Sequence, residues 1–161
     1  MAVDMFLKIG DVKGESRDSA HKEEIDVLAW SWGMAQSGTM HMGGGGGAGK
    51  VNVQDLSFTK YLDKSTPNLM LACCNGKHYP EALLTVRKAG ENPIEYLKIK
   101  MEDVLITSVA TGGSGGEDRL TENITMNFAK VNVEYQPQGK DGKKEGGPIP
   151  MGWDIEENKK L

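Results

Sequence analysis

Three long stretches of the chain alternate apolar and polar residues, and in each of them the alternation changes phase part-way along. In residues 51–62 the apolar positions are odd at first and even from Leu56 onwards, and residues 94–110 and 120–135 switch in the same way. An alternation of period two is typical of β-strands, and a change of phase moves the buried face to the opposite side. Each switch requires a bulge or a new pairing partner, which we expect near Asp55 and Glu102 in the first two runs. Three long strands of this kind predict sheets that curl into a barrel.

The remaining segments predict a mainly β fold with one helix. Alternating runs predict further strands at 3–9, 25–34 and 81–87 and a short closing strand at 149–155. The stretch KSTPNLMLACCNGK predicts a short α-helix with Thr66 as N-cap, Pro67 in the first position and Gly76 as the stop. We therefore expect a single domain over residues 1–161. It would be a small β-barrel of two curved, mostly antiparallel sheets with one flanking helix and a long extended loop.

The predicted strand at 25–34 has two unlike faces. Its large apolar residues predict the core face, whereas its small residues bury little and predict a face towards open space. The large residues are Leu28, Trp30, Trp32 and Met34, and the small ones are Ala29, Ser31 and Gly33.

A bridge of sixteen mostly small or polar residues joins Met34 to Val51. It is much longer than a usual hairpin loop, and its five consecutive glycines have the largest backbone entropy to lose on ordering. We expect an arm that orders against a partner. Val51 and Val53 stand on the face opposite Leu56, so they too need a surface outside the barrel to cover them. The predicted assembly arm comprises Gly43, Gly44, Gly45, Gly46, Gly47, Lys50, Val51 and Val53.

Charge and composition argue against several classes of function. The net charge is −4 and the lysines are scattered, so no basic stripe is available to bind nucleic acid. Asp4 and Lys8 interrupt the N-terminal apolar run, and no run of about 18 apolar residues occurs, so we expect neither a signal peptide nor membrane insertion. A disulfide between the adjacent Cys73 and Cys74 would be strained, which predicts reduced thiols and synthesis in the cytoplasm.

The apparent ligand motifs are better interpreted as structural. Residues 44–50 match the glycine and lysine spacing of a phosphate-binding loop, but the Ser or Thr after the lysine and the following helix are missing. His21, His41 and His78 are far apart in sequence, and no recognised metal-ligand spacing surrounds them. We expect no metal and no cofactor.

Two sets of residues resemble catalytic groups. Cys74 and His78 would both face the end of the helix, but adjacent cysteines on a helix are more often core residues than nucleophiles. Glu117, Asp118 and Glu122 suggest glycosidase chemistry, yet positions on a loop rim and a strand exterior explain them better. We expect no enzyme activity.

In its order of motifs the chain resembles the Hcp family, the haemolysin-coregulated proteins of bacterial type VI secretion systems. The resemblance covers essentially the whole chain. It is carried by MFLKIGDVKGES, EIDVLAWSWGM, GKVNVQDLSFTKYLDKSTPNLM, TGGSGGEDRLTEN and GWDIEEN.

The resemblance implies a small β-barrel that assembles into a homohexameric ring. Rings would stack into a hollow tube that a contracting sheath expels, together with baseplate and spike (VgrG) proteins, and effector proteins would travel in the lumen. It implies a structural role without catalysis, and secretion to the outside or into target cells without a signal peptide. In such a ring we expect the helix that begins at Thr66 and the open face of Ala29, Ser31 and Gly33 to lie towards the lumen and its cargo. Adjacent cysteines are not associated with the family, and whether they are oxidised after secretion stays open.

A carbohydrate-binding β module is the alternative function. Trp30 and Trp32 stand on one face of a strand and would form a platform on which a sugar stacks. Aromatic residues that share a strand face are, however, usually part of the core.

Overall fold

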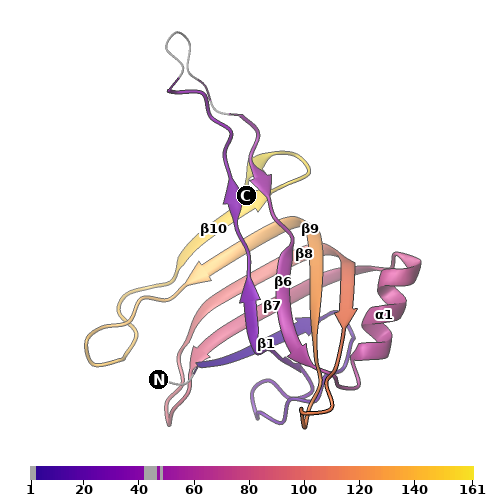
Figure 1. Cartoon of the computed structure of the whole chain (residues 1–161). Coiled ribbons are helices and arrows are strands. Elements are labelled where there is room, and N and C mark those ends of the chain that lie inside the picture. The colour runs from indigo at the N-terminus through magenta and orange to yellow at the C-terminus, as the bar shows by residue number, and fades with distance from the viewer. Residues whose placement is uncertain (1–2, 42–46, 48) are drawn as a thin grey trace.

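The computed structural model describes residues 3–41, 47 and 49–161 and is dominated by strands (Figure 1). Their order along the chain matches the predicted pattern of long strands around one helix. The elements are β1 (Val3–Ile9), β2 (Ile25–Asp26), β3 (Ala29–Ser31), β4 (Met34–Ala35), β5 (Asn52–Val53), β6 (Leu56–Tyr61), α1 (Thr66–Asn75), β7 (His78–Lys88), β8 (Glu95–Thr111), β9 (Thr121–Tyr135), β10 (Ile149–Asp154) and β11 (Lys159–Lys160).

The strand pairs are antiparallel and wrap around a common core. One sheet runs in the order β11-β10-β9-β8-β7-β1-β2, and β6 joins it by pairing with both β3 and β9. The ladder is not continuous around the barrel, because the chain changes neighbours between β2 and β3. There the amide of Val27 donates to Met5 of β1 at 3.0 Å and the amide of Leu28 donates to Thr59 of β6 at 2.8 Å.

The predicted changes of phase coincide with changes of partner or of backbone conformation. The run 51–62 divides at residues 54–55 into β5, which pairs with β4, and β6, which pairs with β3 and β9. In β8 the buried positions are odd-numbered up to Met101 and even-numbered from Val104 onwards. Asp103, between them, has a φ of 59°. In β9 the pairing passes from β6 to β10 near Ala129. These bends let each long strand bury opposite faces in its two halves, as the sequence predicts.

Residues 25–34 do not form the single strand that we expected. They form β2, β3 and β4, which pair with β1, β6 and β5 in turn. The buried face therefore changes here as well: Ile25 and Val27 are buried, whereas Leu28 and Met34 are 40% and 44% exposed and do not belong to the core.

The helix α1 begins at Thr66, one residue earlier than predicted, because Ser65 takes the N-cap position. Pro67 lies in the first turn, and Gly76 ends the helix with a φ of 69°, a conformation that favours glycine. Leu69 and Ala72 are buried where α1 packs against β8, so the helix flanks one side of the barrel (Figure 1).

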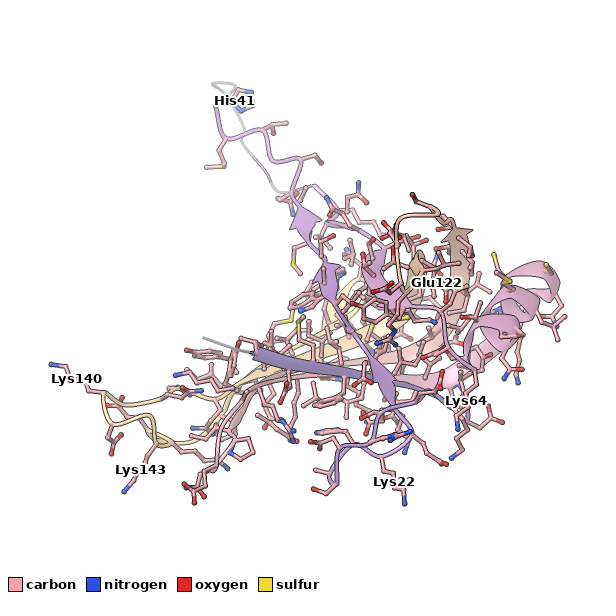
Figure 2. The ribbon with its side chains drawn as sticks, turned by 60° about the horizontal axis from the view of Figure 1, so that its bottom comes forward. Lys22, His41, Lys64, Glu122, Lys140 and Lys143 are labelled. Carbon is pink, nitrogen blue, oxygen red and sulfur yellow. The ribbon has the colours of Figure 1, made fainter. Side chains whose placement is uncertain are left out.

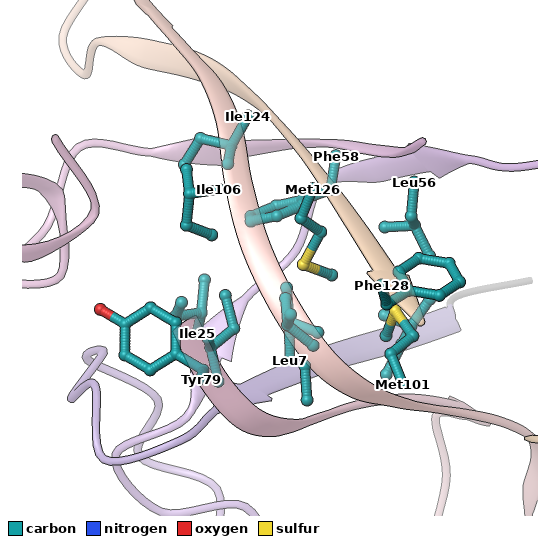
Figure 3. Close-up of a cluster of buried hydrophobic side chains, with 14 of the residues drawn as sticks. Leu7, Ile25, Leu56, Phe58, Tyr79, Met101, Ile106, Ile124, Met126 and Phe128 are labelled. Carbon is teal, nitrogen blue, oxygen red and sulfur yellow. The ribbon is translucent and has the colours of Figure 1, made fainter. Parts of the chain in front are cut away.

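Inward-facing side chains from all around the curved sheet form one hydrophobic core. Leu7, Ile25, Leu56, Phe58 and Met126 are each at most 1% exposed and pack together (Figure 3). Burying a side chain of this size contributes about 1.5–3 kcal/mol, so this core is the main source of stability.

A buried ion cluster closes one end of the core. Lys60 and Glu122, which pair across β6 and β9, are fully buried, and the ammonium of Lys60 contacts the carboxylate of Glu122. The ammonium also donates to Asp63 at 3.0 Å and to Thr66 Oγ1 at 3.1 Å, and Thr66 Oγ1 donates to Glu122 at 2.6 Å. The predicted exterior position of Glu122, which Figure 2 labels, is therefore wrong. An alternation of apolar residues does not reveal a buried carboxylate that is paired with a buried cation.

Candidate assembly surface

The predicted arm leaves the barrel as a narrow ribbon. Met34 and Ala35 of β4 pair with Val53 and Asn52 of β5, and both strands lead away from the main sheet (Figure 1). Further along, the amide of Thr39 donates to the carbonyl of Gly47 at 3.0 Å. Of the predicted arm residues, Gly47 and Lys50 are exposed and Val51 and Val53 are half-buried, while Gly43, Gly44, Gly45 and Gly46 lie outside the described residues. Met40 is 79% exposed.

An apolar hollow lies between the base of the arm and the strands β9 and β10. Its volume is about 320 Å³, and Val51 and Val53 form one wall of it. The facing wall includes Val131, Met151 and Trp153. The indole Nε1 of Trp153 is buried and has no hydrogen-bond partner among the described residues. The two valines are thus partly covered by their own chain, which does not fill the hollow beside them.

The small residues of β3 belong to a wider face of small and hydroxyl side chains, bordered by Asp55, which accepts a hydrogen bond from Thr107 at 2.8 Å. Ala29 and Ser31 are exposed and Gly33, which follows β3, is half-buried. The register places Ser31 in line with Ser57 of β6, Thr125 of β9 and Ser108 of β8. The neighbouring line is Ala29, Thr59, Asn123 and Ala110, in which Thr59 donates to Asn123 at 2.6 Å.

The other candidate residues do not converge on a reactive site. His21 is buried, His41 lies on the arm, and His78 is exposed beside Asp103. Within the described ranges no group of three or more His, Cys, Asp or Glu is arranged to hold a metal ion. Cys73 is half-buried and Cys74 exposed, and both are free thiols.

The carboxylates and tryptophans singled out in the sequence also lie in unlike places. Glu117 and Asp118 are exposed, whereas Glu122 belongs to the buried ion cluster. Trp30 and Trp32 are half-buried against the core, as expected for core aromatics. The indole of Trp32 donates to the carbonyl of Gln54 at 2.9 Å.

Two exposed apolar patches were missed by the sequence analysis. On α1, Met70 and Leu71 are 38% and 61% exposed. At the far end of β9 and β10, Ile149 stands opposite Tyr135, and these two are 60% and 48% exposed. The absence of any charge in TPNLMLACCN would have indicated the first patch. Among the described residues, α1 is too short to be a transmembrane helix, and no other helix of sufficient length and hydropathy is present.

The comparisons with known proteins decide the family. The family model for the type VI secretion system effector Hcp matches residues 6–135. The chain belongs to the Hcp family. It is 75% identical over 159 residues to protein hcp1 of Pseudomonas aeruginosa, and the match covers 98% of each chain.

Solved structures agree with this membership. Hcp1 from Salmonella typhimurium is 42% identical, with a TM-score of 0.84 and complete coverage of both chains. A type six secretion system protein is 34% identical, with a TM-score of 0.93, covering 99% of this chain and all of the other. A type VI secretion system effector from Yersinia pestis is 39% identical, with a TM-score of 0.77, covering 94% of this chain and 100% of the other.

These findings confirm the predicted mainly β fold class and the predicted function as a structural tube subunit of the type VI secretion system. The alternative of a carbohydrate-binding module based on Trp30 and Trp32 finds no support among the relatives.

Proposed function

We propose that this Hcp protein acts as a single-domain subunit whose hexameric rings stack into a tube with effector proteins in the lumen. One chain needs two different self-complementary surfaces for this, because ring closure and ring stacking are distinct heterologous contacts. The apolar hollow at the base of the arm is the observation that carries the proposal. Its wall of Val51 and Val53 is incompletely covered within the subunit.

The two exposed apolar patches support a head-to-tail ring, in which α1 would lie at the contact between neighbours and not, as the sequence suggested, towards the lumen. The helix α1 with Leu71 and the β9–β10 end with Ile149 lie on opposite sides of the barrel (Figure 1). Opposite placement is what a heterologous contact needs, since each copy offers one patch to each neighbour. Apolar patches of this kind are typical of association surfaces.

The arm would then provide the contact to a neighbouring subunit or to the next ring. Completing the burial of Val51 and Val53 stabilises the contact by at most about 3–6 kcal/mol. The conformational entropy that the glycine-rich segment loses on ordering reduces this gain. A contact of this size matters when it is repeated around a ring, but it does not assemble a ring alone.

The face around Ser31 is the surface that we assign to the lumen. Its lines of small and hydroxyl side chains offer a wall of low charge, bordered by the carboxylate of Asp55, on which effectors can travel. The sheath, the baseplate and the spike protein VgrG would meet other surfaces of the assembled tube. In this role the protein performs no catalysis and leaves the cell through the secretion system.

The arm is tested by replacing Val51 and Val53 together with Asp. Neither valine is fully buried, although Val53 packs against the edge of the core, so each barrel should stay folded, whereas rings and tubes should form less readily. Native mass spectrometry and electron microscopy report assembly, and circular dichroism reports the fold. Val3→Asp, at a valine that is 42% exposed on β1, is the matched control. If the double variant forms as many rings and tubes as the parent protein, the arm is not an assembly element.

The lumenal face is tested with Ser31→Gln, which places a bulky side chain on the proposed wall. The variant should keep its oligomeric state and retain effectors less well in co-purification. Ser114→Gln, at an exposed serine of the glycine-rich loop, is the control. Unchanged retention of several effectors in the Ser31 variant would place this face elsewhere.

A further inference from the structure

We propose that rings of this protein stack by placing Arg119 and Leu120 of one copy in an acidic cleft at the opposite end of the next copy. Rings must form before they can stack, so this contact rests on the proposed function, to which it adds a location and a chemistry. The two surfaces lie at the two ends of β6. The acidic cleft includes residues 53–55, just before Leu56, whereas Arg119 lies over the ring of Tyr61.

The acidic cleft has a volume of about 430 Å³ and opens beside the base of the arm. Its apolar members are buried or half-buried and include Leu105, Phe128 and Ile155. Its acidic members are exposed, and they are Asp55, Asp103 and Glu156. The cleft therefore has an apolar floor and a negatively charged rim, which fit a cationic side chain that has an apolar stem or neighbour.

The negative charge of the cleft is not balanced within the subunit. Among the residues that the structure describes, no Lys or Arg lines the cleft, and its one histidine, His78, lies 3.3 Å from Asp103. Asp55 accepts a hydrogen bond from the uncharged Thr107, and within the described ranges neither Asp55 nor Glu156 forms an ion pair. Even with His78 charged, two of the three carboxylates remain without a cation.

The opposite end of β6 carries a hollow of about 580 Å³ with two arginines. The guanidinium of Arg119 lies 3.7 Å from the centre of the Tyr61 ring, and Arg17 comes from the loop of residues 10–24. In the part of the chain that the structure describes, neither arginine forms an ion pair. Leu28 and Leu120 beside them are 40% and 38% exposed. This end thus combines free guanidinium groups with exposed apolar side chains.

The carboxylates of this hollow do not cancel both arginines. Asp63 belongs to the buried ion cluster, where it binds Lys60 at 3.0 Å. Glu15 accepts a hydrogen bond from the backbone amide of Lys64 at 3.0 Å. Asp26 is then the one carboxylate of the hollow without such a contact among the described residues. Two exposed acidic residues of the loop before Arg119 do not line the hollow, and they are Glu117 and Asp118.

The two surfaces are placed as an open stack requires. The six residues of β6 separate them by about 20 Å along one strand. Figure 1 shows the arm and the β10–β11 turn at one end of the barrel and the loop of residues 112–119 at the other. A head-to-tail stack needs such a complementary surface at each end, and the sides of the barrel stay available for ring closure. Val53 lines both the acidic cleft and the apolar hollow, so the contact is continuous with the arm.

Repetition around the ring makes a weak contact effective. An exposed ion pair changes an equilibrium constant by about two- to fivefold. Six equivalent pairs between two rings multiply, so even the lower value gives about sixtyfold.

Charge reversal at either end tests the contact. One variant is Arg119→Glu, and the other combines Asp55→Lys with Glu156→Lys and leaves the strained Asp103 unchanged. Each should keep its rings in native mass spectrometry but need about sixtyfold more protein to stack in sedimentation velocity. A mixture of the two kinds of ring should stack as the parent does, because reversed ends then meet reversed ends. Lys140→Glu, on an exposed loop that lines neither surface, is the matched control and should stack normally (Figure 2).

The outcomes separate this contact from the ring. Variants that stack like the parent, a mixture that does not recover, or parent rings that stay single at every concentration overturn the contact and leave the ring in place. A parent that forms no ring overturns the proposed function together with the contact.

Cross-linking between separate rings tests which surfaces meet. In a Cys73→Ala and Cys74→Ala background, rings with Asp118→Cys are mixed with rings that carry Gln54→Cys, which lines the cleft, and are treated with a short bismaleimide. Both variants keep Arg119 and Glu156. The expected product links residue 118 of one copy to residue 54 of another, whereas Lys140→Cys mixed with Gln54→Cys should give no link. Equal yields from the two mixtures, or no link in either, overturn the proposal.

Discussion

The two halves of the run 51–62 differ in where their side chains find partners. In β6, the ammonium of Lys60 is fully buried and contacts Asp63, Thr66 and Glu122 of its own chain. In the segment that includes β5, Val51 and Val53 border a hollow that their own subunit does not fill. The contacts of β6 are complete within one subunit, whereas those of the segment that includes β5 are not. Fold stability and assembly should therefore respond to different substitutions.

The largest loss of stability is expected from Glu122→Ala. The substitution leaves Lys60 charged and buried without its main partner, which costs about 3–5 kcal/mol of unfolding free energy. Chemical denaturation at a fixed protomer concentration measures the effect, since assembly also contributes to apparent stability. The double variant Lys60→Met with Glu122→Leu should recover most of the loss, because it removes both charges. If Glu122→Ala alone were as stable as the parent, the cluster would not anchor β6 to β9.

A smaller effect is expected at the bend of β8. Asp103 has a φ of 59°, a region that β-branched residues avoid, so Asp103→Val should cost about 1–3 kcal/mol. Asp103→Asn is the control, since Asn tolerates this conformation. Equal unfolding midpoints for the two variants would show that the bend does not depend on this residue.

The ion pair between Arg87 and Asp18 provides a third test, at acid pH, of contacts that are complete within one subunit. The hydrogen bonds from Arg87 lower the pKa of Asp18, against an opposing effect of burial. The stability from this pair is therefore present above the ordinary pKa of an aspartate and is lost as pH falls through the lowered value. Asp18→Asn should flatten the pH dependence of the unfolding free energy in that acid range. An unchanged slope would show that the ion pair does not contribute.

The smallest change in stability is expected on the arm. Met40 is 79% exposed, so Met40→Ser should alter the unfolding free energy by less than about 0.5 kcal/mol. If the arm is an assembly element, the same substitution reduces the yield of assembled particles in native mass spectrometry, with Thr39→Ser as a conservative control. A large loss of stability without loss of assembly would reverse the assignment of the two regions.

Sequence periodicity predicted the long strands and their bends, because alternation directly records which side of a strand is buried. The same reasoning failed for residues 25–34. Short strands that change partner every few residues do not repeat long enough to show a phase, and so Leu28 was assigned to the core although it is exposed. The buried Glu122 was missed because its partner Lys60 lies 62 positions away, beyond any local pattern.

Only part of the candidate assembly surface could be predicted from the sequence. The opposite faces of Val51 and Leu56 indicated that the valines needed cover, and the structure adds the wall of Val131 and Trp153 that borders the remaining space. That wall comes from strands far along the chain, so no local signal connects it to the arm. The contact between His21 and Glu95 was missed for the same reason, since Glu95 approaches His21 only through the fold.

The bends in β8 and β9 also have a mechanical consequence. Both strands run without a break through their bends and pair with each other on either side of them. A load applied to one half of the barrel is therefore passed to the other half along covalent backbone, and not across a packed interface of side chains. Two sheets joined only by packing would be free to slide under such a load, whereas these can separate only if the ladder between β8 and β9 is torn. If a contracting sheath expels the tube, as the proposed function implies, each subunit is loaded in this way at every firing.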